Sequence, residues 1–112
     1  MARLQLSFQE RRFTSRRTPT GLMPGKLFLG ETERELVCRP VDVSRNGMGV
    51  IMSEQMEPGT DLILRFRKQE IHLQVAWGQQ DFAKQDQYRY GLVTVDPRSD
   101  MEQVFSECGC LK

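Results

Sequence analysis

The chain has 112 residues, of which 38% are hydrophobic and 28% are charged, a composition typical of one globular domain and not of a disordered chain. Its net charge of +1 is unevenly divided: the first 17 residues carry five arginines against one glutamate, a net +4, which leaves −3 for residues 18–112. A basic arm on an acidic body favours a site for one anionic partner and excludes the broad basic face that duplex nucleic acid requires.

The first 21 residues are predicted to form a flexible basic arm. They show no sustained hydrophobic period, and they end in Thr18-Pro19-Thr20-Gly21, a run typical of turns. Residues 22–112 are predicted to form the folded domain. No apolar run is long enough for a signal peptide or a transmembrane helix, which, with an odd number of cysteines, predicts a cytoplasmic protein with reduced thiols.

Most of the folded domain is predicted to be β-strand. Apolar residues recur at every second position in 62–66 and 71–77, and the short link at 68–70 predicts an antiparallel hairpin. The alternation places Trp77 on the same face as Ile71, so we expect the indole to pack in the core. Further strands are predicted at 26–29, 36–43, 48–52 and 88–95.

About six short strands with no long helices between them predict an all-β fold, either a closed antiparallel barrel or a small sandwich. One short helix is predicted at about residues 99–108. Ser99 and Glu102 form a capping box at its start, apolar residues recur at helical spacing, and Gly109 follows as a stop signal.

Two segments carry side chains suited to recognising a nucleotide. The first holds Arg12 and Arg16, four residues apart, and a guanidinium donates paired hydrogen bonds to phosphate oxygens or to guanine O6 and N7. The second is the turn Asp42-Val43-Ser44-Arg45-Asn46-Gly47, whose carboxylate and hydroxyl complement the opposite edge of a guanine. Each also has an ordinary interpretation, the first as a solvated basic tail and the second as a plain polar turn.

Together the two segments form a joint pattern, Arg12-x-x-x-Arg16 and, after 25 intervening residues, Asp42-x-Ser44-x-x-Gly47. This pattern resembles the two-part signature of PilZ domains, which are bacterial receptors for the second messenger cyclic di-GMP. The resemblance extends over most of the chain through these framework segments: Met48-Gly49-Val50, Glu57-Pro58-Gly59, Val75-Ala76-Trp77 and Tyr90-Gly91-Leu92.

The resemblance implies a six-stranded antiparallel PilZ-type β-barrel with a short C-terminal helix. The cyclic di-GMP site that it implies consists of Arg11, Arg12, Arg16, Asp42, Ser44 and Gly47. The arginines would hold guanine and phosphate, the carboxylate and hydroxyl would contact a guanine edge, and the glycine would permit the tight turn. The chain departs from the family pattern after Arg17, where a polar segment replaces an apolar strand, and at Arg45 and Asn46, which replace small residues.

The function implied by the resemblance is signal transduction. Ligand binding would order the arginine arm, which would then present a new surface to a separate protein effector. Many relatives bind the ligand as a stacked pair of molecules; the stoichiometry stays open here, as does the choice between a monomer and a ligand-dependent dimer. The alternative is a PilZ-like interaction module that no longer binds nucleotide.

No enzyme, metal site or cofactor is predicted. His72 is the only histidine and falls on the polar face of its strand, where no catalytic partner is expected. The three cysteines, Cys38, Cys108 and Cys110, are one ligand short of a closed zinc site. A barrel for single-stranded nucleic acid would need a basic groove, which the acidic body disfavours.

Overall fold

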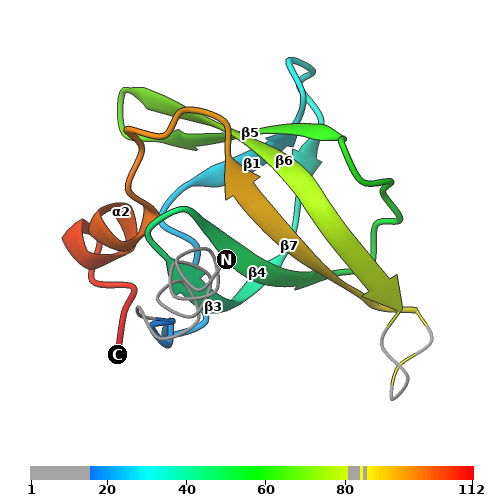
Figure 1. Ribbon diagram of the computed structural model, residues 1–112, viewed down its shortest axis with the longest axis horizontal. Coiled ribbons are helices and arrows are strands. Elements are labelled where there is room, and N and C mark those ends of the chain that lie inside the picture. Colours follow the sequence, from blue (N-terminus) through cyan, green and yellow to red (C-terminus); the bar gives the residue numbers. More distant parts are fainter. Residues whose placement is uncertain (1–15, 81–83, 85) are drawn as a thin grey trace, which may run out of the picture.

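The computed structural model describes residues 16–80, 84 and 86–112, so Arg11 and Arg12 lie outside the described part of the chain. Seven strands and one helix are described (Figure 1). In chain order they are β1 (Lys26–Leu29), β2 (Glu35–Leu36), β3 (Arg39–Ser44), β4 (Gly47–Met52), β5 (Asp61–Phe66), β6 (Gln69–Gln80), β7 (Tyr88–Thr94) and α2 (Met101–Glu107). No helix in the described residues is long and apolar enough to span a membrane.

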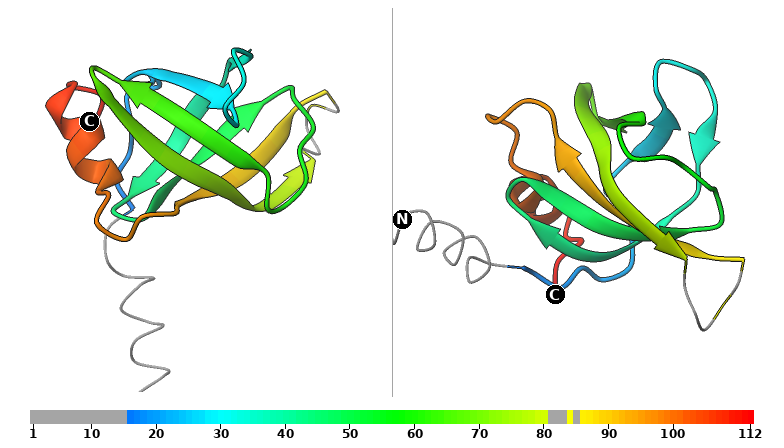
Figure 2. Two further views of the ribbon diagram at one scale, coloured as in Figure 1. Left: turned by 90° about the horizontal axis from the view of Figure 1, so that it is seen from above. Right: turned by 45° about the vertical axis from the view of Figure 1, so that its right-hand side comes forward.

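The strands form one antiparallel sheet in the order β2-β1-β5-β6-β7-β4-β3. The sheet curls strongly about its own axis, and Figure 2 shows the strands wrapping into a half-barrel. The all-β, antiparallel, barrel-type fold predicted from the sequence is therefore confirmed. The predicted hairpin is β5 and β6, with Phe66 paired to Gln69.

The structure has one strand more than the six expected, because the segment predicted as a single strand at 36–43 is divided. β2 pairs with β1 at one edge of the sheet, whereas β3 pairs with β4 at the other edge. Residues 37–38 carry the chain between the two edges, so no continuous ladder can include both segments. The hydrophobic periodicity of a segment does not show that the chain passes from one edge of the sheet to the other within it.

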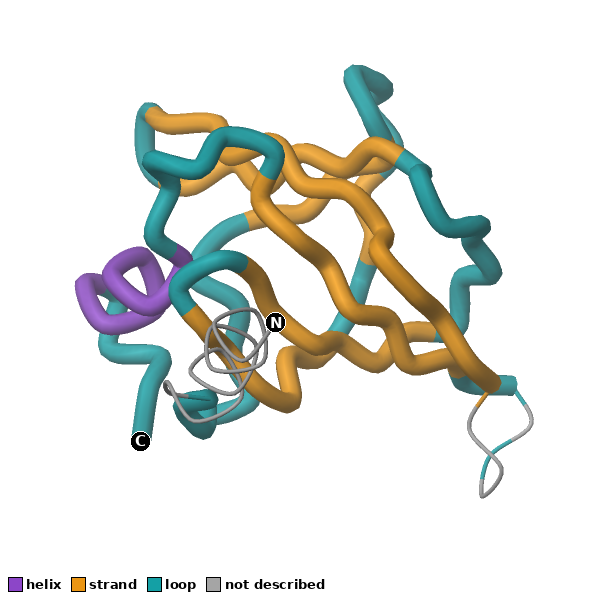
Figure 3. The backbone as a smooth tube through the Cα atoms, viewed as in Figure 1, coloured by secondary structure: helices purple, strands orange, loops and turns teal. Residues whose placement is uncertain are grey.

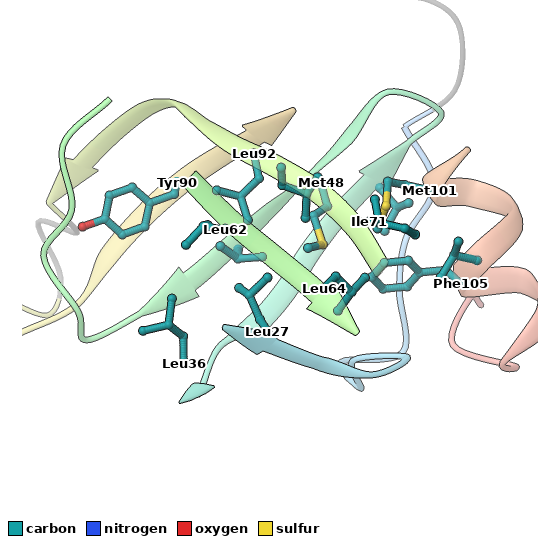
Figure 4. Packing of buried hydrophobic residues seen from close by; sticks show 14 of the residues in the cluster. Leu27, Leu36, Met48, Leu62, Leu64, Ile71, Tyr90, Leu92, Met101 and Phe105 are labelled. Atoms are coloured by element: carbon teal, nitrogen blue, oxygen red, sulfur yellow. The ribbon is translucent and has the colours of Figure 1, made fainter. Parts of the chain in front are cut away.

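The hydrophobic core lies on the concave side of the curled sheet. Figure 4 shows Tyr90 at one end of this core and Phe105 at the other, with the leucines of β1, β5 and β7 between them. The hydroxyl of Tyr90 donates to the carbonyl oxygen of Glu54 at 2.7 Å and accepts from the backbone N–H of Met56, also at 2.7 Å. The phenol therefore stabilises the β4–β5 connection as well as the core.

The helix α2 closes one end of the half-barrel (Figure 3), and Met101 and Phe105 are its fully buried anchors. The predicted capping box is wrong in its first residue. Asp100 is the N-cap, and its carboxylate accepts from the backbone N–H of Gln103 at 3.1 Å. Gly109 has φ +67° just beyond the helix, which confirms its predicted role as the stop.

The prediction that Trp77 packs in the core is wrong. A register shift between Val75 and Trp77 interrupts the pairing of β6 with β7, and a β-bulge turns the following side chain to the other face of the sheet. The indole is 43% exposed on the convex face, whereas Ile71, Leu73 and Val75 before the bulge are buried as expected.

The described end of the basic arm, residues 16–20, is bonded to the folded domain. Arg17 exchanges two backbone hydrogen bonds with Val43 of β3, at 2.7 and 3.0 Å. Further along, the N–H of Thr20 donates to the carbonyl of Cys110, and the N–H of Lys112 donates to the carbonyl of Thr18. Residues 17–20 therefore run between β3 and the last residues of the chain (Figure 2).

Candidate functional site

A row of four residues crosses the convex face of the sheet, one on each of four adjacent strands. Asp42 of β3 pairs with Gly49 of β4, Gly49 pairs with Gly91 of β7, and Gly91 pairs with Trp77 of β6. The two central positions lack side chains, and the two outer side chains fold inward over them. A Cβ at Gly49 would lie 2.8 Å from Oδ1 of Asp42, and one at Gly91 would overlap the indole of Trp77.

This row forms the floor of a pocket of about 160 Å³. The volume is below the roughly 300–1,000 Å³ of a cleft that encloses a whole small molecule. It therefore accommodates one base or one phosphate and not an entire dinucleotide. The lining residues are Arg16, Asp42, Ser44, Asn46, Gly47, Met48, Gly49, Ala76, Trp77, Gly91, Leu92 and Val93.

The carboxylate of Asp42 is the electrostatic centre of the pocket, with only 19% of its side chain exposed. Its Oδ1 accepts from the backbone N–H of Gly49 at 3.0 Å. Its Oδ2 lies 3.1 Å from Nη1 of Arg16 and 3.4 Å from Nη2 of Arg89. Two guanidinium groups thus share one carboxylate oxygen, which leaves a net positive charge beside the glycine floor.

Ser44 and Gly47, at the two ends of the β3–β4 turn, both line the pocket. Ser44 pairs with Gly47, and Arg45 and Asn46 form the two-residue connection. The glycine does not have a positive φ, so the turn itself does not require it. A Cβ at Gly47 would overlap the carbonyl oxygen of Leu92 on β7, so close strand approach is the reason that only glycine fits here.

Arg45 and Asn46, the two turn residues that depart from the family pattern, have different neighbours in the structure. The carbonyl of Arg45 accepts from the N–H of Met101 at the start of α2, and its guanidinium lies 3.9 Å from Asp100. Arg45 therefore links the turn to the helix. Asn46 lines the pocket, and its backbone carbonyl accepts from the N–H of Thr94 at 2.8 Å.

The family model for the PilZ domain matches residues 10–108. This chain belongs to the PilZ domain family. The match covers the basic segment, the turn, the sheet and the helix, so the resemblance first seen in the signature extends over most of the chain. Comparisons with curated proteins and with solved structures give no match.

The PilZ signature residues that the structure describes come together in one place. Arg16 from the first half of the signature and Asp42, Ser44 and Gly47 from the second half all line the same pocket. The bridge between Arg17 and Val43 accounts for this, because it fixes the preceding arginine beside the end of β3. A larger hollow of about 610 Å³ beside α2 contains none of the signature residues.

Sequence reasoning did not identify four further residues of this PilZ domain's pocket region: Gly49, Trp77, Arg89 and Gly91. The segments around Gly49 and Gly91 are part of the family resemblance, but sequence reasoning assigned them to the framework of the fold and not to the binding site. Arg89 lies on β7, two residues before Gly91, and reaches diagonally across β4 to Asp42. His72, by contrast, is exposed as predicted, and the described residues contain no cluster of metal-ligand side chains.

Proposed function

We propose that this PilZ domain is a non-enzymatic receptor for cyclic di-GMP and that it signals to a separate protein effector. The observation that carries the proposal is that Arg16, Asp42 and Ser44, drawn from both halves of the signature, line one pocket on the convex face of the sheet. A positively charged pocket beside the planar indole of Trp77 suits a flat, anionic ligand.

The proposed ligand pose follows from complementary hydrogen-bonding groups. A guanine presents N1–H and its exocyclic amine as donors on one edge, which a carboxylate such as that of Asp42 accepts. Its other edge presents O6 and N7 as acceptors, which match the paired donors of an arginine such as Arg16. The exposed indole of Trp77 provides a flat apolar wall for the base.

The size of the pocket suggests that the sheet and the arm bind different parts of the ligand. The pocket has a volume of about 160 Å³, enough for one base but not for a dinucleotide, so the phosphates and the second base stay on the surface. In this proposal Arg11 and Arg12 bind those exposed groups, because the first 17 residues carry a net +4 that phosphates neutralise. Ordering of the arm over the ligand is the signal to the effector.

Titration calorimetry tests the binding step. We expect heat with cyclic di-GMP and none with cyclic di-AMP, because adenine lacks the two donors that Asp42 accepts. Asp42→Asn should weaken binding at least tenfold, since one carboxylate oxygen is replaced by a donor amide. Asp61→Asn is the matched control, because Asp61 is also a strand carboxylate that accepts from a side chain, at 2.9 Å from Gln74.

Two results would overturn the proposal or relocate its site. Absence of heat with cyclic di-GMP at micromolar protein would leave the alternative, an interaction module that does not bind nucleotide. Unchanged affinity in a chain carrying both Arg12→Ala and Arg16→Ala would show that the arm does not contribute. Arg98→Ala is the control for lost surface charge, because Arg98 is exposed and pairs with Asp96 away from the pocket.

The signalling step has its own measurement. Hydrogen exchange of residues 8–16 should slow when cyclic di-GMP is added, because ordered amides are protected. The amides of Arg17 and Thr20, which already donate to the folded domain, are the internal reference. Unchanged exchange in a chain that binds the ligand would separate binding from arm ordering and would refute only the second.

A further inference from the structure

Most of the hydrogen-bond acceptor positions of the Asp42 carboxylate are already used in the described structure. It receives the Gly49 N–H on Oδ1 and the guanidinium groups of Arg16 and Arg89 on Oδ2. A carboxylate offers about four lone-pair positions. With three of these in use, a guanine edge that donates two hydrogen bonds cannot be accommodated unless one present donor leaves.

The three donors differ in how firmly the fold holds them. The Gly49 N–H belongs to the backbone of β4 and cannot move without breaking the sheet. Arg89 is carried by β7, an interior strand that pairs with β4 on one side and β6 on the other. Arg16 lies outside the strands, one residue before the bridge at Arg17, and its side chain is 65% exposed against 47% for Arg89. Arg16 is therefore the donor that leaves at least cost.

Electrostatics favours the same order of events. Arg16 and Arg89 approach the same oxygen at 3.1 and 3.4 Å, so the two like charges repel each other across Oδ2. A phosphate or guanine acceptor nearby offers Arg16 a new partner. The carboxylate is only 19% exposed, so once Arg16 has left it needs another positive neighbour to offset its loss of hydration.

We infer that Arg89 is a positioning residue, which keeps the Asp42 carboxylate oriented and charge-compensated when the ligand draws Arg16 away. This inference rests on the proposed function. Arg89 acts on the ligand through Asp42 and not by direct contact, and this distinguishes it from the arginines of the signature. Its effect on binding should therefore depend on the presence of the carboxylate.

Affinity measurements on a set of variants test this dependence. Arg89→Gln should weaken cyclic di-GMP binding about five- to twentyfold, which lies within the range of effects for residues coupled in one salt-bridge network. Arg89→Lys should restore affinity to within about threefold, because a single amine can replace the single Nη2 contact. In an Asp42→Asn background Arg89→Gln should change the affinity less than twofold, whereas a direct contact to phosphate would keep its full effect.

The matched control is Arg65→Gln, since Arg65 is another strand arginine, 37% exposed, whose Nε lies 3.0 Å from Glu70. It should bind like the unmodified chain. Equal affinity of Arg89→Gln and the unmodified chain, while the latter binds normally, would overturn the inference alone. Absence of binding by the unmodified chain would overturn the proposed function, and the inference with it.

A second measurement needs no ligand. The Gly49 amide signal in a nitrogen–proton NMR spectrum reports the hydrogen bond to Asp42. Arg16→Ala should leave this signal near its original position, because Arg89 still holds the carboxylate. Adding Arg89→Gln should move it towards the position seen in Asp42→Asn. A full shift in Arg16→Ala alone would show that Arg89 does not hold Asp42, and would refute the inference even where the affinity data cannot be measured for the weakest variants.

Discussion

Replacing Gly47 by alanine tests why glycine is required at this position of the signature. The added Cβ would overlap the carbonyl oxygen of Leu92 and lie 3.1 Å from its carbonyl carbon and 3.2 Å from the Cα of Val93. All three obstacles are backbone atoms of β7, which cannot rotate away as a side chain would. Relief requires separating β4 from β7 at the point where β4 begins.

Overpacking of this kind costs about 1–3 kcal/mol, and a backbone obstacle places Gly47→Ala near the upper end. For a domain of this size that corresponds to a melting temperature lower by roughly 10 °C. Urea unfolding followed by circular dichroism measures the free energy directly, and an unchanged slope with denaturant would show that the unfolded state is not altered.

Gly59 provides the matched comparison, because it has φ +90° with nothing within 4 Å of the position of a Cβ. Alanine there should cost about 1–2 kcal/mol from backbone strain alone, and asparagine should cost less, since it tolerates left-handed backbone. At Gly47 asparagine should be at least as costly as alanine. A Gly47→Ala chain within about 0.5 kcal/mol of the original, or a Gly47→Asn chain more stable than it, would refute the close-approach explanation.

Three other expectations concern the core, the helix and the thiols. Tyr90→Phe should lower the free energy of unfolding by about 1–3 kcal/mol, because two backbone groups lose their hydroxyl partner; an unchanged urea midpoint would contradict this. Asp100→Ala should cost about 1 kcal/mol and Ser99→Ala almost nothing, and the reverse order in thermal unfolding would restore the cap predicted from the sequence. Burial raises the pKa of the Cys38 thiol from 9.0 to about 11, so the unfolded chain releases this proton first and stability should fall as pH rises from about 9 to 11; Cys38→Ala should fall less steeply in the same urea series.

The strands could be predicted wherever burial alternates regularly. In the first half of β6 burial alternates, with Ile71 and Leu73 buried and His72 exposed, so the period of two was visible in the sequence. In β5 the apolar residues recur in the same way, although Ile63 is buried as well as Leu62 and Leu64. Trp77 continued that period in the sequence but lies after a bulge, which reverses the face. The polar residues Gln79 and Gln80 that follow it were the available sign that the core side had ended.

The site was predictable only in its signature residues. Arg16, Asp42 and Ser44 were identified because the joint pattern has a known spacing, and the structure brings them into one pocket. Arg89 gave no such signal. Its proximity to Asp42 depends on β7 lying next to β4, a pairing between strands that are distant in the chain, and on a side chain long enough to cross an intervening strand.

The close packing of Asp42 on Gly49 and of Trp77 on Gly91 also affects the entropy of recognition. A pocket lined by flexible side chains loses rotamer freedom when it is filled, about 0.5–1.5 kcal/mol for each long side chain immobilised. Peptide groups of paired β-strands are already ordered by the sheet and have no rotamers to lose. The two side chains that pack on these glycines, and the peptide groups beneath them, are held in place before a ligand arrives, so the ordering cost of binding falls mainly on the arm and the ligand.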